Sequence, residues 1–333
     1  MRLRPLSALL AAAALCAACG STNSGRPPLP SPSLVLDFAP NAVHAGIYAA
    51  LAHRLDRADG IRLHVVVPSA TTDSIELLES GRVDFAVLDI HDLALARERH
   101  AGLVGIMALV QRPLSAVIAA PPITTPRALE GRAVGITGVP SDTAVLRSIV
   151  AGAGGDPRRV RTITIGFNAV ADLLAGRVAA ATAFWNAEGV TLAARRPGFH
   201  TFRVDRYGAP SYPELIVCAT AQTLRGRSRL AFAVVRTLIA GYALTLREPA
   251  RSAADLASLV PGLDAGLTRA QLHVLLPAFR APDGAVGQLD LGRLRSWAAW
   301  EARFGIVSRP PDVRTMFDPG LAAAAARSLG AVQ

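Results

Sequence analysis

Loops that follow several expected β-strands carry the side chains best suited to hold a small polar molecule. The first loop runs from Asp37 to Tyr48, and its Pro40-Asn41 turn leads into a helix that Asn41 can cap. Ligands of open α/β sheets bind outside the carboxyl ends of the strands, so we expect these loops to share one cleft. The other strand-end segments are Leu88–Asp92, Gly138–Thr143, Phe184–Gly189 and Tyr207–Glu214.

The candidate ligand-binding residues divide into rings, which can stack on a flat ligand, and polar groups, which can hydrogen-bond its edge. Each of three candidates has a structural alternative: Tyr48 better fits a helix core position, His44 also fits a first helical turn, and Asp142 fits a helix cap. The aromatic candidates are Phe38, Tyr48, Trp185 and Tyr212. The polar candidates are Asp37, Asn41, His44, Asp89, Ser141, Asn186 and Glu188.

The charge of these loops favours one class of ligand. A binder of sulfonate, nitrate or phosphate needs arginine or bare helix N-termini in its cleft. The strand-end loops instead offer carboxylates, and a buried carboxylate facing an anion costs several kcal/mol. They suit a neutral or weakly basic heterocycle with N–H donors, such as an aminopyrimidine. The carboxylates are Asp37, Asp89, Asp92, Asp142, Glu188 and Glu214.

Short apolar runs alternate with amphipathic stretches up to Thr220, which predicts an α/β fold with largely parallel sheets. After Thr220 the pattern is helical, with no strong strand signal. The expected strands are 34–38, 61–67, 83–88, 103–110, 116–120, 133–137, 160–165, 179–184, 200–204 and 214–220. The expected later helices are 229–247, 253–260, 268–277, 291–304 and 319–328.

About 300 residues are too many for one ordinary core, so we expect two lobes. Pro121-Pro122 is a natural first crossing between them, and the Tyr207–Pro210 segment a natural second. The prediction is a discontinuous first lobe, 34–120 plus 214–333, and a second lobe, 121–213. The helical tail then packs back onto the first lobe.

The N-terminus is typical of an exported lipoprotein. Arg2 and Arg4 precede an apolar stretch too short to span a bilayer, and small residues then lead to Cys19-Gly20. This resembles a lipobox, with Cys16 where leucine is usual, and predicts a lipoprotein signal peptide over residues 1–19 with acylation of Cys19. A plain secretory signal is the alternative. Residues 20–33, rich in Ser, Pro and Gly, read as a flexible tether.

Composition excludes several classes of protein. The net charge is +10, but the basic residues are all arginines, scattered without aromatic interleaving, so we expect no nucleic-acid binding. Of three cysteines, Cys218 alone lies outside the leader, in an apolar run that predicts a buried position. We therefore expect neither a disulfide framework nor a cysteine-based metal site, and we assign no metal and no cofactor.

The first loop, Leu36-Asp37-Phe38-x-Pro40-Asn41-x-x-His44-x-Gly46-x-Tyr48, resembles the opening motif of the NMT1/THI5-like substrate-binding proteins. The segments Asn186-x-Glu188-Gly189 and Tyr207-Gly208-x-Pro210-x-Tyr212-Pro213-Glu214 are also similar to that family. The resemblance implies a type II periplasmic-binding-protein fold with ligand between two lobes. It also implies an ABC importer's receptor for a thiamine pyrimidine precursor or for riboflavin.

Fungal members of the same superfamily are pyrimidine synthases, which the resemblance implies use pyridoxal phosphate on a lysine and a cysteine-rich iron motif. This chain has no lysine, so it cannot form an internal aldimine, and we expect a binder rather than an enzyme. The expected partners are a small molecule, ABC permease subunits and, through the lipid, the membrane. The expected state is a monomer outside the cytoplasm. A sensing receptor remains the alternative to an importer's receptor.

Overall fold

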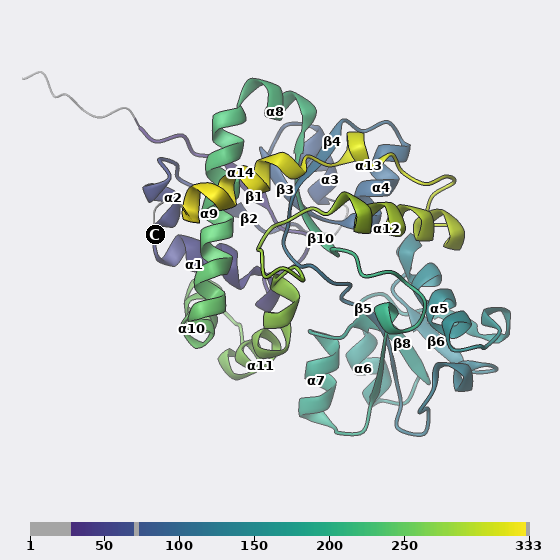
Figure 1. The fold of residues 1–333 in the computed structure, drawn as a ribbon. Helices are drawn as coiled ribbons and strands as arrows, with labels where there is room; N and C mark the ends of the chain where they lie inside the picture. Colours follow the sequence, from purple (N-terminus) through teal and green to yellow (C-terminus); the bar gives the residue numbers. More distant parts are fainter. Residues whose placement is uncertain (1–27, 70–72, 331–333) are drawn as a thin grey trace, which may run out of the picture.

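Two five-stranded mixed sheets, each flanked by helices, form two lobes (Figure 1). The computed structural model describes residues 28–69 and 73–330. The expected export signal, Cys19 and most of the expected tether lie outside these residues. The α/β fold with a helical C-terminal tail is confirmed.

The sheet of the first lobe has the order β2-β1-β3-β10-β4. Strands β1, β2 and β3 are parallel, whereas β10 runs antiparallel to β3 and β4. The chain joins this sheet earlier than expected, because the Arg62 amide already donates to the Pro30 carbonyl at 2.8 Å, inside the expected tether. The bounds are β1 Ser33–Val35, β2 His64–Val66, β3 Phe85–Asp89, β4 Leu103–Ala108 and β10 Leu215–Thr220.

Alternating residues of these strands bury two different faces of the sheet. Leu34, Phe85 and Val217 face one helical layer, whereas Val35 and Cys218 face the other. Cys218 is fully buried as expected, and burial raises the pKa of its thiol. The first layer contains α1 (Ala45–Ala52), α9 (Ser228–Arg247), α10 (Pro249–Leu259), α11 (Ala265–Leu275) and α14 (Pro319–Gly330). The second contains α3 (Asp73–Glu79), α4 (Ile90–Glu98), α12 (Leu291–Phe304) and α13 (Val313–Met316).

Helix α9 is apolar enough over its 20 residues to cross a membrane, yet here it is a core helix. It packs against α1 so closely that glycine is needed on both helices. A Cβ on Gly241 would lie 2.0 Å from the Gly46 carbonyl oxygen, and a Cβ on Gly46 would lie 2.4 Å from the Tyr242 ring. Tyr242 also donates its hydroxyl to the Val43 carbonyl at 2.7 Å. The tail therefore fixes the helix that follows the first cleft loop.

The sheet of the second lobe has the order β7-β6-β8-β5-β9. Strands β6, β7 and β8 are parallel, and β5 lies antiparallel between β8 and β9. The strand bounds are β5 Ser115–Ala119, β6 Ala133–Ile136, β7 Arg161–Thr164, β8 Ala180–Phe184 and β9 His200–Arg203. The helices of this lobe are α5 (Pro140–Gly152), α6 (Ala169–Leu174) and α7 (Glu188–Arg195).

The structure corrects the expected position of the first crossing. Strand β5 was expected in the first lobe, but it pairs with β8 and β9, so the chain crosses before Ser115 rather than at Pro121-Pro122. The proline pair is a turn at the far end of β5. The apolar sequence of β5 does not indicate which of the two sheets the strand joins, because both sheets contain buried apolar strands.

Helix α12 of the tail ties the two crossings together. The Arg293 guanidinium donates to the backbone carbonyls of Gln111 in the first crossing and Ser211 in the second. Further along the helix, Trp300 Nε1 donates to Ser148 Oγ of the second lobe at 3.0 Å. The remaining short helices are α2 (Leu55–Ala58) and α8 (Ala221–Gly226), both in the first lobe.

Candidate functional site

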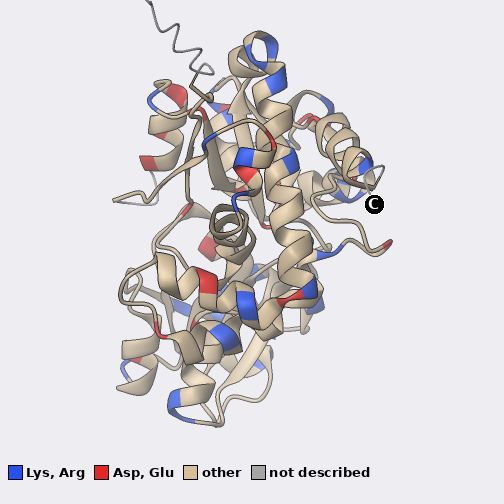
Figure 2. Ribbon diagram, turned by 90° about the vertical axis from the view of Figure 1, so that its left-hand side faces the viewer, with Lys and Arg blue, Asp and Glu red and all other residues tan. Residues whose placement is uncertain are grey.

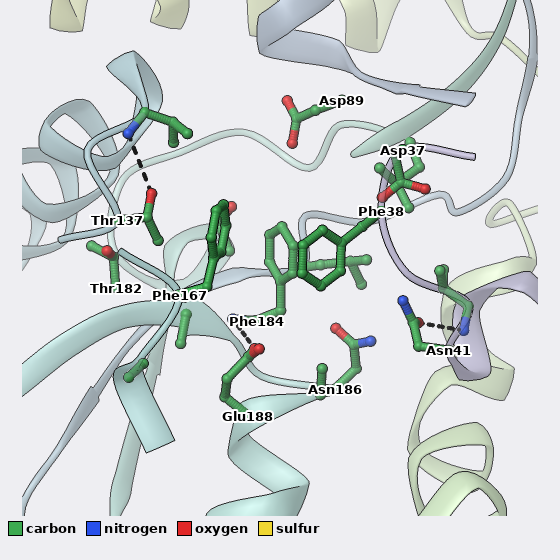
Figure 3. Close-up of a pocket in the computed structure, with 18 of the residues that line it drawn as sticks. Asp37, Phe38, Asn41, Asp89, Thr137, Phe167, Thr182, Phe184, Asn186 and Glu188 are labelled. Carbon is green, nitrogen blue, oxygen red and sulfur yellow. Dashed lines mark hydrogen bonds between the residues drawn. The ribbon is translucent and has the colours of Figure 1, made fainter. Parts of the chain in front are cut away.

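A cavity of about 360 Å³ lies between the lobes, at the ends of strands from both sheets (Figure 3). It is large enough for a substituted ring compound, at the lower end of the size typical for ligand pockets. Its polar and aromatic lining comprises Asp37, Phe38, Asn41, Asp89, Asp92, Ser115, Thr137, Ser141, Asp142, Phe167, Thr182, Phe184, Asn186, Glu188, Thr191 and Gln271.

Three phenylalanine rings gather in this cavity from both lobes. Phe38 follows β1, Phe167 follows β7, and Phe184 ends β8. The centroids of the Phe38 and Phe167 rings lie 5.3 Å apart, with the ring planes tilted by 37°. Both rings are exposed, at 41% and 61%, although they touch each other. An apolar ring surface that reaches solvent at the cleft is suited to stacking on a flat ligand.

The loop after β1 is held rigid by its own side chains. Asn41 caps the short helix Ala42–His44, since its Oδ1 accepts the Val43 amide at 3.0 Å. The backbone amide of Asn41 donates to His44 Nδ1 at 3.1 Å. The other ring nitrogen, Nε2, therefore carries the proton, and it lies 2.8 Å from Asp37 Oδ1. This network fixes the backbone on both sides of Phe38.

The turn between β8 and α7 holds a second polar group. Glu188 Oε2 accepts the Phe184 amide at 3.0 Å and so fixes the end of the strand. Burial raises the pKa of Glu188. Asn186, in the same turn, is buried at 2% exposure, and its Oδ1 has no hydrogen-bond partner among the residues that the structure describes.

The floor of the cavity is joined to a buried ionic network. Asp89 lines the cavity and caps α4 by accepting the His91 amide at 2.8 Å. His91 Nδ1 contacts the Glu301 carboxylate of α12, and its Nε2 lies 3.2 Å from the Tyr212 hydroxyl. Burial alone would lower the pKa of His91, but Glu301 and then Asp89 outweigh it and raise that pKa to about 10. For the carboxyl groups burial has the opposite effect. It raises the pKa of Asp89 well above its usual range, and it also raises the pKa of Glu214.

One group among the described residues has donor atoms close enough to share a metal ion. It consists of Asp89, His91 and Glu214, whose donor atoms all lie within 4.8 Å of one another. Glu214 already accepts the Leu114 amide at 3.0 Å and the Ser115 hydroxyl at 2.5 Å. Both ring nitrogens of His91 are engaged, and a ring held protonated offers no lone pair to a metal. The group is explained as an ion-pair network that joins the cavity floor to the crossings.

The loop after β6 supplies hydroxyl groups rather than a free carboxylate. Asp142 accepts from the Thr137 amide at 2.5 Å, from the Thr137 hydroxyl at 2.6 Å and from the Gly138 amide at 3.3 Å. This carboxylate closes its own loop in front of α5. Ser141, beside it, lines the cavity.

The cavity is acidic. None of the described residues that line it is an arginine, although Figure 2 shows basic residues distributed over both lobes. An anion entering this cavity would meet carboxyl groups with no arginine among the described lining residues to offset them. The lining carboxylates are Asp37, Asp89, Asp92, Asp142 and Glu188.

Seven of the eleven residues expected from the sequence line the cavity, and four do not. His44 is buried behind Asp37, and Tyr48 is a core residue of α1 at 6% exposure. Trp185 packs under Arg203, 4.1 Å from ring centroid to guanidinium, and Tyr212 is buried against His91. The seven are Asp37, Phe38, Asn41, Asp89, Ser141, Asn186 and Glu188.

Phe167 and Phe184 line the cavity but were not named among the candidate ligand-binding residues. Phe184 was expected as the last residue of the strand 179–184 and as the first of the strand-end segment Phe184–Gly189, and its position directly before the Trp185–Glu188 turn is the signal that could have singled it out. Phe167 lies in a Gly166-Phe167-Asn168 turn that was not among the expected strand-end segments. Only the meeting of the two lobes brings it to Phe38.

Two lobes around a cavity at their strand ends define a protein with the periplasmic-binding-protein fold. The chain belongs to the NMT1/THI5 like family, whose model matches residues 41–252. It is 27% identical over 305 residues to the formylaminopyrimidine-binding protein of Halalkalibacterium halodurans, covering 89% of this chain and 92% of that one.

Solved structures show the same fold at low sequence identity. The periplasmic aliphatic sulphonate binding protein of Escherichia coli has a TM-score of 0.70 at 18% identity, covering 87% of this chain and 92% of that one. The periplasmic nitrate-binding protein of Synechocystis PCC 6803 also has a TM-score of 0.70, at 10% identity, covering 90% and 89%.

Proposed function

We propose that this protein is the extracytoplasmic solute-binding protein of an ABC importer and captures a planar nitrogen heterocycle of the aminopyrimidine kind. The observation that carries the proposal is the lining of the cavity. It combines three phenylalanine rings from two lobes with five carboxylates and, among the described residues, no arginine. The phenylalanine rings can stack on a flat ligand, and the carboxylate oxygens can accept hydrogen bonds from N–H groups on the ligand.

The name of the Halalkalibacterium halodurans relative supports this choice of ligand. A sulfonate or nitrate is the second candidate, because structural neighbours with those names share the fold. The cavity opposes it, since an anion facing buried carboxylates with no arginine beside it costs several kcal/mol. Riboflavin, a larger ring system, is the third candidate.

Binding couples to closure of the lobes. Phe38 and Phe184 come from different lobes, so a ring that stacks on both is held fully only when the cleft is shut. The ligand therefore shifts the population towards the closed form. The closed form is the one that we expect to dock on the permease.

Binding measurements with the purified protein test the ligand class. Formylaminopyrimidine, riboflavin, an aliphatic sulfonate and nitrate are compared by thermal shift and then by isothermal titration. A ligand at a hundred times its dissociation constant adds about 2.7 kcal/mol of stability. We expect this shift from formylaminopyrimidine and not from the anions. A shift from the sulfonate or nitrate alone would reject the proposal.

We propose further that Cys19 anchors the protein to the membrane after export. The support is the sequence around Cys19, which lies outside the described residues. Labelling of expressing cells with an alkyne fatty acid should mark the wild type and not Cys19→Ser. Equal labelling of both would reject the anchor.

We also propose that the bound heterocycle is not transformed. The chain has no lysine for a Schiff base, and the described cavity lining contains no cysteine. Prolonged incubation with formylaminopyrimidine, followed by mass spectrometry, should return the compound unchanged. A new product that forms at a rate proportional to protein concentration would overturn this.

A further inference from the structure

Asn186 Oδ1 is a buried acceptor that nothing in the described part of the chain satisfies. The residue is 2% exposed yet lines the cavity, and Figure 3 shows its side chain directed toward the Phe38 ring. It follows Phe184 by two residues in the turn between β8 and α7. A buried amide oxygen without a partner destabilises the protein, so a group that donates to it gains affinity.

The neighbouring acceptors already hold the protein's own loops. Glu188 Oε2 accepts the Phe184 amide at 3.0 Å, and Asn41 Oδ1 accepts the Val43 amide at 3.0 Å. Asp37 Oδ1 is engaged by His44 Nε2 at 2.8 Å. Asn186 differs from these groups because its oxygen fixes no loop, which leaves it available to a ligand.

The chemistry of the ligand follows from this oxygen and its surroundings. An anion would bring an acceptor against an acceptor, with no arginine among the described lining residues to offset it. Figure 3 shows the Asn186 side chain beside the Phe38 and Phe184 rings, so the edge of a ligand ring that stacks on them would lie within reach of this amide. An amino group on that edge offers the N–H that the amide oxygen lacks.

We propose that Asn186 Oδ1 accepts a hydrogen bond from an amino group on the ring of the bound heterocycle. Asn186 thereby selects amino-substituted rings over rings of the same shape that carry no N–H. The inference rests on the proposed function and adds to it the substituent and the residue that recognises it. A site built around a hydrogen bond discriminates strongly, because the analogue leaves a buried polar group unpaired.

A pair of matched probes tests this role. 4-Aminopyrimidine and 4-methylpyrimidine have nearly the same shape, and each is titrated against the protein as a competitor of formylaminopyrimidine. We expect the wild type to bind the amino compound tenfold or more tightly than the methyl compound. In Asn186→Leu the preference should fall below about threefold, whereas Asn186→Asp, which keeps an acceptor, should retain it. Gln222→Leu, an exposed amide on α8, is the control and should behave as wild type.

The outcomes separate this inference from the proposed function. Failure of the wild type to bind any of the pyrimidines would reject the function itself. A wild type that binds them, with an unchanged preference in Asn186→Leu, would overturn the role of Asn186 alone. Loss of the preference in Asn186→Asp as well would show that the amide donates rather than accepts, which also overturns it. If Asn186→Leu does not fold, Asn186→Ala provides the same comparison.

Discussion

Phe38 and Phe167 meet across the cleft with ring centroids 5.3 Å apart, although 128 residues separate them in the chain and they belong to different lobes. Both rings stay exposed, at 41% and 61%, although they touch. The pair is therefore a contact between the two lobes at the cavity that solvent still reaches.

Removing the Phe38 ring should weaken ligand binding. Phe38→Ala takes away a stacking surface and the contact with Phe167, and we expect affinity for formylaminopyrimidine to fall tenfold or more, about 1.4 kcal/mol, by isothermal titration. Ile163→Ala removes an exposed apolar side chain from β7 without touching the cavity lining, and it should leave affinity unchanged. Equal effects of the two substitutions would contradict the role of Phe38.

Trp185→Ala should act on stability rather than on binding. The ring is 9% exposed, its Nε1 donates to the Pro113 carbonyl at 2.9 Å, and Arg203 covers its face. Truncating such a ring costs about 3–5 kcal/mol, measurable by urea denaturation. Phe199→Ala is the matched control, because Phe199 is a half-buried ring that also lies under an arginine, Arg196 at 5.0 Å. We expect a much smaller loss there, and we expect folded Trp185→Ala to keep the wild-type affinity.

Stability should fall as pH rises from neutral to alkaline. The folded protein raises the pKa of His91 from 6.5 to about 10, so the proton that stabilises the fold is fully held below about pH 6.5 and is lost as pH approaches 10. The expected slope is on the order of 1 kcal/mol per pH unit in that interval. Other groups with raised pKa values, such as Asp89 and Glu214, also contribute to the slope, so a His91 variant is needed to assign it.

Denaturation curves between pH 7 and pH 10 measure this slope, with His91→Gln and His64→Gln compared. His64 is exposed, and its substitution should leave the slope unchanged. His91→Gln should flatten it. A wild-type stability that stays level over the interval would mean that His91 is neutral in the fold.

Gly241→Ala should strongly destabilise the first lobe. The added Cβ would lie 2.0 Å from the Gly46 carbonyl oxygen, so α1 and α9 must separate, which costs about 1–3 kcal/mol or more. Gly226→Ala is the control, because a Cβ there meets nothing within 4 Å. Alanine favours helix by up to about 1 kcal/mol, so Gly226→Ala should be neutral or slightly stabilising by thermal denaturation.

The two-lobed α/β fold could be predicted from the sequence because its signals are local. Alternation along the strands, the glycines that end helices and the helical pattern after Thr220 all act within a few residues. The membership of β5 could not be predicted in this way. Its apolar run fits either sheet, and only its pairing with β8 and β9 decides.

Residues of the candidate site could be predicted from the sequence where the residues of a single loop form a recognisable motif. Asp37, Phe38 and Asn41 lie in one turn, which short-range hydrogen bonds to Val43 and His44 hold in place. Residue type was a poorer guide, since Trp185 and Tyr212 look like stacking residues but find hydrogen-bond partners inside the core. Phe167 reaches the cavity only because the lobes face each other, a relationship between segments far apart in sequence.

The pairing of β4 with β10 has a consequence for the ancestry of the molecule. These strands are antiparallel neighbours, and the Leu109 amide donates to the Leu215 carbonyl at 2.8 Å, so the chain leaves the first sheet and re-enters it at one spot. The entire second lobe is thus an insertion at the tip of a β-hairpin. A short turn from Val110 to Glu214 would restore an ordinary hairpin and leave the first sheet unbroken. Such a protein could have acquired its second lobe in one genetic event, and could exchange it for another of different ligand preference.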